Sequence, residues 1–461
     1  MLPRILALRG SPGAEHMSAA ETRALQEERL QAIVAHAYHN TRFWREWFDS
    51  AGIRPEDIRT LDDLSKIPLC TKGDLLRRPE ADRLSEPPDR CMRASTSGST
   101  GGPLSVFYSK RYADYLMSNS VFRIPRMTGL GVSSKLLGIA FAVPSKIPED
   151  PDLPSRTPPS RVFGVAGTLF RPLIHRFKKT VYISYGIGDR LDEIVSFRPG
   201  HIYGTPAYLR LLADVVRAEG IKKLRPKGVF LTGEPLDEPT RRYIDETFGC
   251  KTYDGYGANE FGLLAVECRE RHGMHVMSDM AVVEVVKDGR AASPGEAGEL
   301  VITGLLNEAM PLIRYRIGDI GVMSDKQCSC GLTMPILASV EGRSMDHIRL
   351  HDGRAVSPKK VTTLMHGIDG LPRAQLIQKS LNAFALRVFD KGAGRNPAVD
   401  EFLQTLRAEL AEGVVMDVRY ESPDQLKAKF RPVLSQVTGQ SALAPEPTFT
   451  EGTANRKAAV P

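Results

Sequence analysis

The chain has 461 residues, of which 42% are hydrophobic and 25% charged, a composition that supports a folded protein with one large core and one small core. Its formal charge of +7 is spread along the sequence without a block of Lys and Arg, which argues against nucleic acid as a partner. No apolar run reaches the roughly 18–20 residues of a membrane span. Six cysteines without framework spacing favour a reducing compartment, so we expect a cytoplasmic protein.

The N-terminal part predicts a helix and a compact group of aromatic side chains. Apolar residues recur at helical spacing between residues 19 and 49, and this stretch ends with Phe43, Trp44, Trp47 and Phe48. We expect these rings in the core or between packed domains, and the aromatic helix also suggests a homodimer surface. The segments 60–64 and 71–75 predict two short capped helices.

A loop at Ser95–Pro103 combines three glycines with five hydroxyl side chains. Its backbone N–H groups and hydroxyls are the donors that a polyphosphate requires. It is not a Walker loop, because Gly102 is followed by Pro103 and the next lysine is Lys110. Taken alone, the same composition also fits a flexible turn, so the rest of the chain must decide between the two.

From Leu136 onward, short apolar runs alternate with helical segments. The expected strands cover residues 136–143, 181–184, 201–204, 228–233 and 250–257, with helices at 206–219 and from Glu238. This rhythm predicts a mostly parallel sheet covered by helices, with its ligand site at the strand ends. The Pro- and Arg-rich stretch 144–172 is plain surface or a mobile loop over that site.

The last third of the chain changes character twice. Residues 281–325 are β-rich, with strands expected at 282–286, 299–303 and 311–319. A smaller α+β unit follows, with strands at 373–379 and 383–389, a helix at 397–412 and a strand at 414–420. We therefore predict an α/β protein with a large domain over residues 1–342, a small mobile domain over 343–440 and a disordered tail over 441–461.

Four further segments carry polar groups suited to a nucleotide. Gly233-Glu234-Pro235 follows a strand and can form a flat turn against a purine, and residues 253–260 offer an aromatic face and a carboxylate. Asp319 follows a tight turn, where its carboxylate suits a ribose diol, and Gly342–Asp346 opens the smaller unit. Each segment alone is a weak signal, and their order behind Ser95–Pro103 is what carries weight.

In that order, these segments resemble the adenylate-forming superfamily. The similarity is strongest to the branch of phenylacetate–CoA ligases, CapK-type proteins and phenazine-modifying ligase-like proteins. It begins at His39–Trp44 and at Lys66–Leu75 and ends at Lys429–Val433, so it covers nearly the whole chain. The implied fold is a large adenylate-forming domain of mixed parallel sheets, helices and a β-rich lobe, followed by a small mobile domain.

The resemblance implies a two-step reaction on a small carboxylic acid, which is expected to be aromatic or heteroaromatic. The acid attacks the α-phosphate of ATP, whose phosphates are bridged by Mg²⁺, and an acyl-adenylate and pyrophosphate form. A thiol then displaces AMP. The acceptor stays open between coenzyme A, the phosphopantetheine of an acyl carrier protein and an amine. A nucleotide-binding scaffold without ligase activity is the alternative from another functional class.

The resemblance also implies roles for individual residues. Catalytic roles fall to Lys429, Glu260 and Arg343, with Glu260 also the Mg²⁺ ligand and Lys427 the local competitor of Lys429. The expected nucleotide contacts are Ser97, Gly98, Ser99, Thr100, Gly101, Gly233, Glu234, Pro235, Asp254, Tyr256, Gly257, Asn259 and Asp319. The candidates for the acid pocket are Phe141, Tyr203, Gly204 and Ala258.

Three positions depart from the usual pattern of the superfamily. Asn259 stands in place of Thr or Ser, Ala428 in place of Gly, and Met345 where the hinge residue is often acidic. An amide can still donate to a phosphate, so Asn259 is compatible with activity. These departures concern the efficiency of domain rotation and leave the expected fold unchanged.

Cys268, His275, Cys328 and Cys330 form a second constellation. Three thiolates and one imidazole make a complete tetrahedral set for structural zinc, and a free buried cysteine pair is the alternative. Members of the same branch are similar here, which favours zinc. The site would fasten the β-rich lobe, because no ligand position is left for water, and His272 is the alternative nitrogen ligand.

Overall fold

The computed structural model describes residues 14–96, 102–130, 135–141, 178–183, 187–390, 396–410, 412–422 and 430–437. Several of the sequence-based predictions lie outside these residues: loop positions Ser97–Gly101, the stretch 144–172, Lys427 and Lys429, and the tail over 441–461. Phe141 ends a described strand, but its side chain also lies outside the description.

The N-terminal segment forms two helices where the sequence predicted one. Helix α2 (Ala19–Asn40) and helix α3 (Arg42–Ser50) are separated by Thr41, whose backbone is extended. The Thr41 hydroxyl accepts a hydrogen bond from the N–H of Trp44 at 3.3 Å, so it caps α3 and starts a new helix. The break turns the aromatic residues of α3 toward the interior of the protein.

The aromatic residues of α3 belong to the core. Phe43, Trp44 and Phe48 are buried, and the Trp44 ring N–H donates to the carbonyl of Pro311 at 2.9 Å. The same core contains residues of the β-rich region, such as Ile302 and Ile313. These three rings therefore belong to the core, and the expected homodimer surface stays a prediction.

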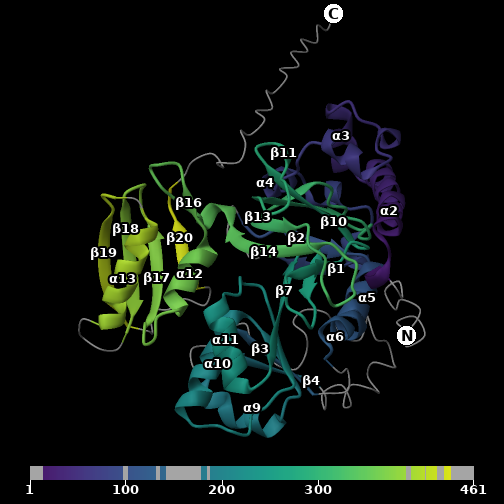
Figure 1. Ribbon diagram of the computed structural model, residues 1–461. Helices are drawn as coiled ribbons and strands as arrows, with labels where there is room; N and C mark the ends of the chain where they lie inside the picture. The colour runs from purple at the N-terminus through teal and green to yellow at the C-terminus, as the bar shows by residue number, and fades with distance from the viewer. Residues whose placement is uncertain are drawn as a thin grey trace, which may run out of the picture.

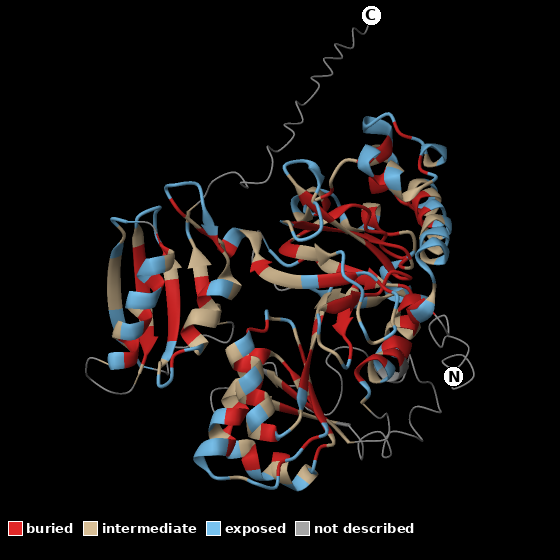
Figure 2. Ribbon diagram, viewed as in Figure 1, coloured by how far each residue is buried: buried red, intermediate tan, exposed pale blue. Residues whose placement is uncertain are grey.

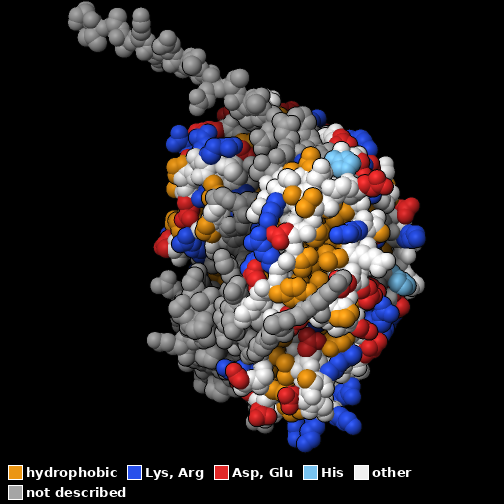
Figure 3. Space-filling view, turned by 90° about the vertical axis from the view of Figure 1, so that its left-hand side faces the viewer, with side chains coloured by type: hydrophobic (Ala, Val, Ile, Leu, Met, Phe, Trp, Pro, Cys, Tyr) orange, Lys and Arg blue, Asp and Glu red, His pale blue; other side chains and the backbone are white. Residues whose placement is uncertain are grey.

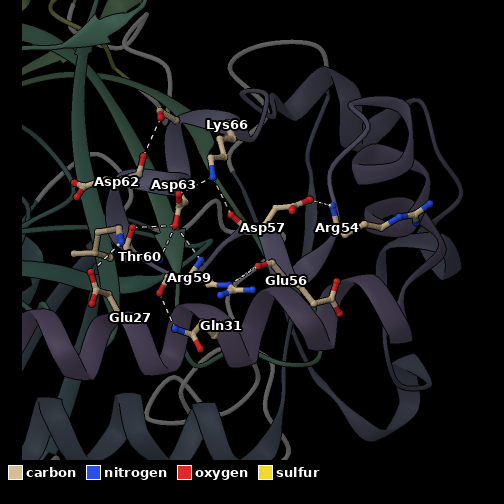
Figure 4. Close-up of polar contacts among 12 residues, drawn as sticks. Glu27, Gln31, Arg54, Glu56, Asp57, Arg59, Thr60, Asp62, Asp63 and Lys66 are labelled. Atoms are coloured by element: carbon tan, nitrogen blue, oxygen red, sulfur yellow. Dashed lines mark hydrogen bonds and ion pairs between the residues drawn. The ribbon is translucent and has the colours of Figure 1, made fainter.

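The two short capped helices are confirmed. The first is the 3₁₀ helix η3 (Leu61–Lys66), where the Asp63 carboxylate accepts from the backbone N–H groups of Thr60 at 2.8 Å and Arg59 at 3.0 Å (Figure 4). Gln31 of α2 donates to the carbonyl of Arg59 at 2.6 Å and so ties this turn to the long helix. The second is α4 (Lys72–Leu76), capped by Thr71 and Asp74.

The large sheet is continuous and has twelve strands among the described residues, in the order β11-β10-β12-β13-β14-β9-β8-β7-β6-β5-β3-β4. Its parallel half confirms the predicted β–α–β rhythm. That half consists of β3 (Leu136–Phe141), β4 (Lys178–Ile183), β5 (His201–Gly204), β6 (Gly228–Thr232) and β7 (Lys251–Ala258). Helices α9 (Leu191–Phe197), α10 (Pro206–Ala218) and α11 (Glu238–Phe248) pack on it with their own apolar core.

The antiparallel half contains the predicted β-rich region 281–325, extends beyond it on both sides, and joins the parallel half at β7. Its strands are β8 (Gly262–Glu267), β9 (Met274–Val276), β10 (Ala281–Lys287), β11 (Arg290–Ala291), β12 (Ala297–Gly304), β13 (Tyr315–Ser324) and β14 (Ile336–Arg343). The strand expected at 311–319 begins only at Tyr315. Figure 2 shows that the centre of this half is almost entirely buried beneath α2 and the other N-terminal elements.

The C-terminal unit has its own sheet in the order β19-β18-β17-β20. Strands β17 (Arg373–Gln378), β18 (Ala383–Phe389), β19 (Val415–Glu421) and β20 (Val433–Ser435) pack with α12 (Pro358–His366) and α13 (Pro397–Glu409) around a separate apolar core. In Figure 1 this unit lies beside the parallel half, with α12 next to α11. The expected helix 397–412 ends earlier, at Glu409.

On the face that Figure 3 shows, described side chains of both charges are mixed. Figure 3, which looks at the side of the C-terminal unit, shows Lys and Arg interspersed with Asp and Glu and with apolar side chains. Across the described ranges, every helix is too short or too polar to span a bilayer.

The burial of Trp44 yields a prediction about stability. Replacing Trp44 with Ala should lower the free energy of unfolding by about 3–5 kcal/mol. The substitution leaves a cavity in the core where the indole packed, and the Pro311 carbonyl loses its hydrogen-bond donor. Urea unfolding followed by circular dichroism measures this loss. The partly exposed Trp47 is the control, and Trp47→Ala should cost clearly less. Equal losses would contradict the placement of Trp44 at the centre of the core.

Candidate active site

Several of the sequence-predicted segments meet at one edge of the large sheet. In the parallel half, Gly204 pairs with Leu231, and Thr232 pairs with Gly255. This register places Tyr203 and Gly204, the turn Gly233–Pro235 and the end of β7 side by side at the carboxyl ends of neighbouring strands. Ligands of open α/β sheets bind at this edge. The edge is also where the parallel half meets the antiparallel half.

Tyr256, Asp319 and Arg343 form a chain of polar contacts across this edge. The Tyr256 hydroxyl donates to Oδ2 of Asp319 at 2.8 Å, and Nε of Arg343 lies 3.1 Å from Oδ1 of the same carboxylate. Arg343 also donates to the carbonyl of Ile317 at 2.7 Å, which fixes the guanidinium beside β13. Burial raises the pKa of Asp319, and the Arg343 charge opposes that rise.

Glu260 is a second carboxylate of the site, in the turn between β7 and β8. Its side chain is buried, and Oε1 accepts a long hydrogen bond of 3.4 Å from the Tyr315 hydroxyl. Burial raises the pKa of Glu260, an effect that Arg343 opposes. A carboxylate held in this way keeps lone pairs available for a cation.

Asn259 connects this turn to the start of the Ser95–Pro103 loop. Its side-chain amide donates to the carbonyl of Ser95 at 2.9 Å, and the Tyr108 hydroxyl donates to the Asn259 carbonyl. Ser95 ends β1 (Met92–Ser95), and Tyr108 ends β2 (Ser105–Tyr108), the two strands that hold the loop. The loop and the Glu260 turn are therefore anchored to each other at their bases.

Backbone geometry explains two glycines of the site. A Cβ on Gly257 would lie 2.6 Å from the carbonyl oxygen of Gly262, so no other residue fits the tight reversal from β7 to β8. Gly233 has a φ of 88°, a left-handed conformation in which a side chain is strained. Next to it, Oε2 of Glu234 accepts from the N–H of Ala207 at 3.2 Å.

The candidate acid-pocket residues have packing roles that the structure shows directly. A Cβ on Gly138 of β3 would lie 2.5 Å from the ring of Tyr203, so this glycine makes room for the tyrosine. A Cβ on Gly204 would clash with Leu209 and with the carbonyl of Ile139. Ala258 ends β7 beside Gly262. Their contact with an acid stays a prediction.

Lys72 belongs to the site, although its segment was predicted only as a capped helix and as part of the family resemblance, with no site role for this lysine. It is the first residue of α4. The pKa of Lys72 is lowered, mainly by burial; the charge of Arg343 lowers it further, whereas the charge of Glu260 opposes the shift. Backbone pairing two residues before Lys72 places it here. Cys70 forms an isolated parallel β-bridge with Tyr315, and the Cys70 carbonyl accepts a hydrogen bond from the N–H of Arg316 at 2.8 Å. No local motif could reveal this pairing across some 245 residues of chain.

The four proposed zinc ligands come together in the β-rich half. Their ligand atoms lie within 4.8 Å of one another, with 3.6 Å between the sulfurs of Cys268 and Cys328 and 3.4 Å between Sγ of Cys330 and Nε2 of His275. Ligands on a tetrahedral zinc ion are spaced about 3.3–3.8 Å apart, given bonds of about 2.0–2.3 Å. The exposed His272 is outside this group, so His275 is the nitrogen donor that the geometry supports.

Backbone donors also point at these sulfurs. The N–H of Glu270 donates to Sγ of Cys268, and the N–H of Leu332 donates to Sγ of Cys330, both at 3.4 Å. Such second-layer hydrogen bonds orient thiolates that bind a metal. The donor set therefore fits zinc.

Comparison with known proteins now adds to this geometry. Residues 16–308 match the model of the family described as AMP-binding enzyme. The chain belongs to the AMP-binding enzyme family. It is 30% identical over 377 residues to phenylacetate-coenzyme A ligase of Thermus thermophilus, covering 79% of this chain and 80% of that protein. The Escherichia coli enzyme of the same name is 32% identical over 345 residues, covering 72% of this chain and 73% of its own.

Two further similarities concern the branch of the family and the fold. Protein CapK of Staphylococcus aureus is 20% identical over 402 residues, covering 83% of this chain and 82% of its own. A crystal structure of 2-hydroxyisobutyryl-CoA ligase in the postadenylation state aligns over 92% of both chains, with a TM-score of 0.74 and 23% identity. These similarities confirm the predicted superfamily, its phenylacetate–CoA ligase branch and the fold.

Within this member of the family, Asp254 is a carboxyl group set apart from the Tyr256–Asp319 contacts. Its Oδ1 accepts from the N–H of Gly255 at 2.9 Å, and its own N–H donates to Glu267, which forms an ion pair with Arg241. Burial and then the charge of Glu267 raise the pKa of Asp254 to about 7. Its expected nucleotide contact stays a prediction.

The raised pKa of Asp254 predicts a pH dependence of stability. Below about pH 4 Asp254 is protonated in both the folded and the unfolded state. Between about pH 4 and 7 only the folded state keeps the proton, so the free energy of unfolding falls by up to about 1.4 kcal/mol for each unit by which the pH rises. Asp254→Asn has no titrating group at this position, so its free energy of unfolding lacks this pH-dependent loss. The variant should gain unfolding free energy relative to the parent between pH 5 and 7.5 in urea titrations. A difference that does not change with pH would contradict the assignment.

Proposed function

We propose that the protein activates a small carboxylic acid with ATP as an acyl-adenylate and then transfers the acyl group to the thiol of coenzyme A. The observation that carries this proposal is the chain of contacts from Tyr256 through Asp319 to Arg343, with Glu260 and Lys72 beside it. It supplies an aromatic ring, a carboxylate for a ribose diol and cations for phosphates within one edge of the sheet. The similarity to AMP-forming acid–CoA ligases supports the same reaction.

In the first step, the acid carboxylate attacks the α-phosphorus, and the bond to pyrophosphate breaks. A carboxylate is already a nucleophile, so the protein needs no strong base and contributes positioning and charge neutralisation. Tyr256 would lie against the adenine opposite Gly233–Pro235, and Asp319 would accept hydrogen bonds from the ribose hydroxyls. Arg343 and Lys72 would face the phosphates, and Lys429 would add its charge at the α-phosphate.

A divalent cation fits beside Glu260. The carboxylate is buried, and its hydrogen bonds come from the Tyr315 hydroxyl, a long one, and from its own backbone N–H, so it can still serve as a hard oxygen ligand. Bound Mg²⁺ would neutralise charge on the phosphates during attack. Glu260 would hold the ion, and the hydroxyls of the Ser95–Pro103 loop would bind the leaving pyrophosphate.

In the second step, the thiolate attacks the acyl carbon and AMP leaves with its phosphate. We propose an aromatic acid, because the Tyr203 ring occupies the space that Gly138 leaves at the expected pocket and because curated relatives are named phenylacetate ligases. We also propose that the division at residues 342 and 343 separates the catalytic domain from a mobile small domain. Gly342, with a φ of 102°, lies at that division.

The overall reaction gives the decisive test. Purified protein with ATP, Mg²⁺ and a panel of aromatic and aliphatic acids should show acid-dependent ATP–pyrophosphate exchange, and coenzyme A should give the acyl thioester by mass spectrometry. Lys429→Ala should lower exchange at least about a hundredfold, because the α-phosphate loses its cation. Lys427→Ala is the matched control and should keep near-parental exchange. Absent exchange with every acid, despite ATP binding, would leave the scaffold as the better function.

We further propose that Cys268, His275, Cys328 and Cys330 hold one structural zinc ion. The spacing of the four ligand atoms and the N–H donors at two sulfurs support this site. Four protein ligands fill a tetrahedral ion and leave no position for water, so the zinc would stabilise the β-rich half and would take no part in adenylation.

Metal analysis tests the zinc proposal without reference to activity. The purified protein should contain one zinc per chain by inductively coupled plasma mass spectrometry, and Cys328→Ser should lower both zinc content and the thermal midpoint. Cys250→Ser, at a cysteine outside the group, should change neither. A metal-free protein that has the same thermal midpoint after incubation with zinc would refute the site.

A further inference from the structure

Two tyrosine hydroxyls hold the turn that carries Glu260. The Tyr108 hydroxyl donates a hydrogen bond to the carbonyl of Asn259, and the Tyr112 hydroxyl donates to the carbonyl of Phe261 at 2.6 Å. These carbonyls belong to the residues immediately before and after Glu260. The backbone on both sides of the carboxylate is therefore tied to side chains that come from outside the turn.

The two tyrosines lie on the elements that follow the Ser95–Pro103 loop. Tyr108 ends β2, and Tyr112 lies in the first turn of α5 (Lys110–Ser118). Between them, Ser109 caps α5, because its hydroxyl accepts from the N–H of Tyr112 at 3.2 Å. The junction of β2 and α5 thus presents both hydroxyls to the same turn.

Asn307 fixes this junction from the β-rich half. Its side-chain oxygen accepts from the N–H of Ser109 at 3.2 Å, and its side-chain N–H donates to the carbonyl of Phe107 at 2.9 Å. It therefore bonds to the residues on both sides of Tyr108. Because Asn307 is itself buried, these hydrogen bonds have little competition from water. The backbone from which the Tyr108 ring extends is held in place.

The packing of the rings leaves the two hydroxyls little freedom. The rings of Tyr108 and Tyr112 meet edge-on, with 5.6 Å between their centroids, and Tyr112 is only 2% exposed. Burial raises the pKa of both hydroxyls, so each keeps the proton that it donates. A buried carbonyl that loses such a donor is left without a partner, and its peptide group then gains by turning toward another one.

We propose that Tyr108 and Tyr112 are positioning residues of the adenylation reaction: they orient the peptide groups on both sides of Glu260 and so keep its carboxylate in place for the divalent cation that binds with ATP. This inference rests on the proposed function, in which Glu260 holds Mg²⁺. Outer residues that orient a metal ligand typically change metal affinity by about 10–100-fold. The effect of the tyrosines should be confined to the part of ATP binding that depends on the cation.

Equilibrium dialysis of labelled ATP, without any acid substrate, tests this role in the absence of turnover. The ratio of ATP affinity in Mg²⁺ to ATP affinity in EDTA measures what the cation contributes. In Tyr108→Phe and in Tyr112→Phe, which remove only a hydroxyl, this ratio should fall about tenfold, while the affinity in EDTA stays within about twofold of the parent's. A parental ratio in both variants, or a parent protein whose ATP affinity does not respond to Mg²⁺, would overturn the proposal.

Tyr115→Phe is the matched control, because Tyr115 lies on the same helix and its hydroxyl donates to the carboxylate of Asp279 in the core. Loss of a hydrogen bond to a charged acceptor should lower the thermal midpoint at least as much as Tyr112→Phe does, with no change in the affinity ratio. An equal fall of the ratio in Tyr115→Phe would indicate general loosening and overturn the positioning role. Tyr108 is only half-buried, so Tyr108→Phe carries the test if Tyr112→Phe does not fold.

A second comparison asks whether the tyrosines act through the carboxylate. In a Glu260→Gln background, adding Tyr108→Phe should lower the affinity ratio no further, because the ligand that the hydroxyl positions is already gone. A full further fall in that background would overturn the proposal.

ATP–pyrophosphate exchange distinguishes failure of this inference from failure of the proposed function. Exchange in the parent, together with weakened exchange in the tyrosine variants that excess Mg²⁺ restores, would support both. Exchange absent in the parent would refute the function, and a lowered affinity ratio in the dialysis would then still support the positioning role. Normal exchange in the parent with an unchanged ratio in both variants would refute the positioning role alone.

Discussion

The reversal of the chain between β7 and β8 is the constraint on which the site depends. Gly257 passes so close to the Gly262 carbonyl that a single methyl group would not fit. This tight turn ends the parallel half of the sheet and begins the antiparallel half. It also carries Asn259 and Glu260. A looser turn would separate the ring of Tyr256 from Asp319, because the two residues come from the two halves.

The consequence is a site assembled from two kinds of sheet. The parallel strands provide neighbouring turns at their carboxyl ends, which suits the flat recognition of a base. The antiparallel strands provide Asp319, Arg343 and Tyr315, whose side chains stand on one surface beside those turns. Charges of both signs are packed here under partial burial, so each carboxylate depends on a nearby cation. A 2.7 Å hydrogen bond between Asp237 and His366 connects this edge to the C-terminal unit.

Local sequence patterns predicted the elements well and their long-range joining poorly. The strand at residues 201–204 and the strand at 383–389 were placed at their observed bounds, because apolar runs bounded by turn residues are local signals. The helical prediction over 19–49 was confirmed except for the break at Thr41, because a threonine that caps a new helix looks like any other polar residue in a helical pattern. Lys72 was missed at the site for a different reason. Its placement follows from a backbone pairing with β13, which no short motif encodes.

The union of α3 with the β-rich half has a consequence for how the chain folds during synthesis. The indole of Trp44 bonds to Pro311, a residue 267 positions further along. The first helices to leave the ribosome therefore present an apolar surface whose partner strands are not yet made. At about 5–20 residues per second, that surface waits on the order of ten to fifty seconds. Such a delay makes the N-terminal aromatic layer the part of the nascent chain that most needs protection from aggregation, long before any nucleotide can bind.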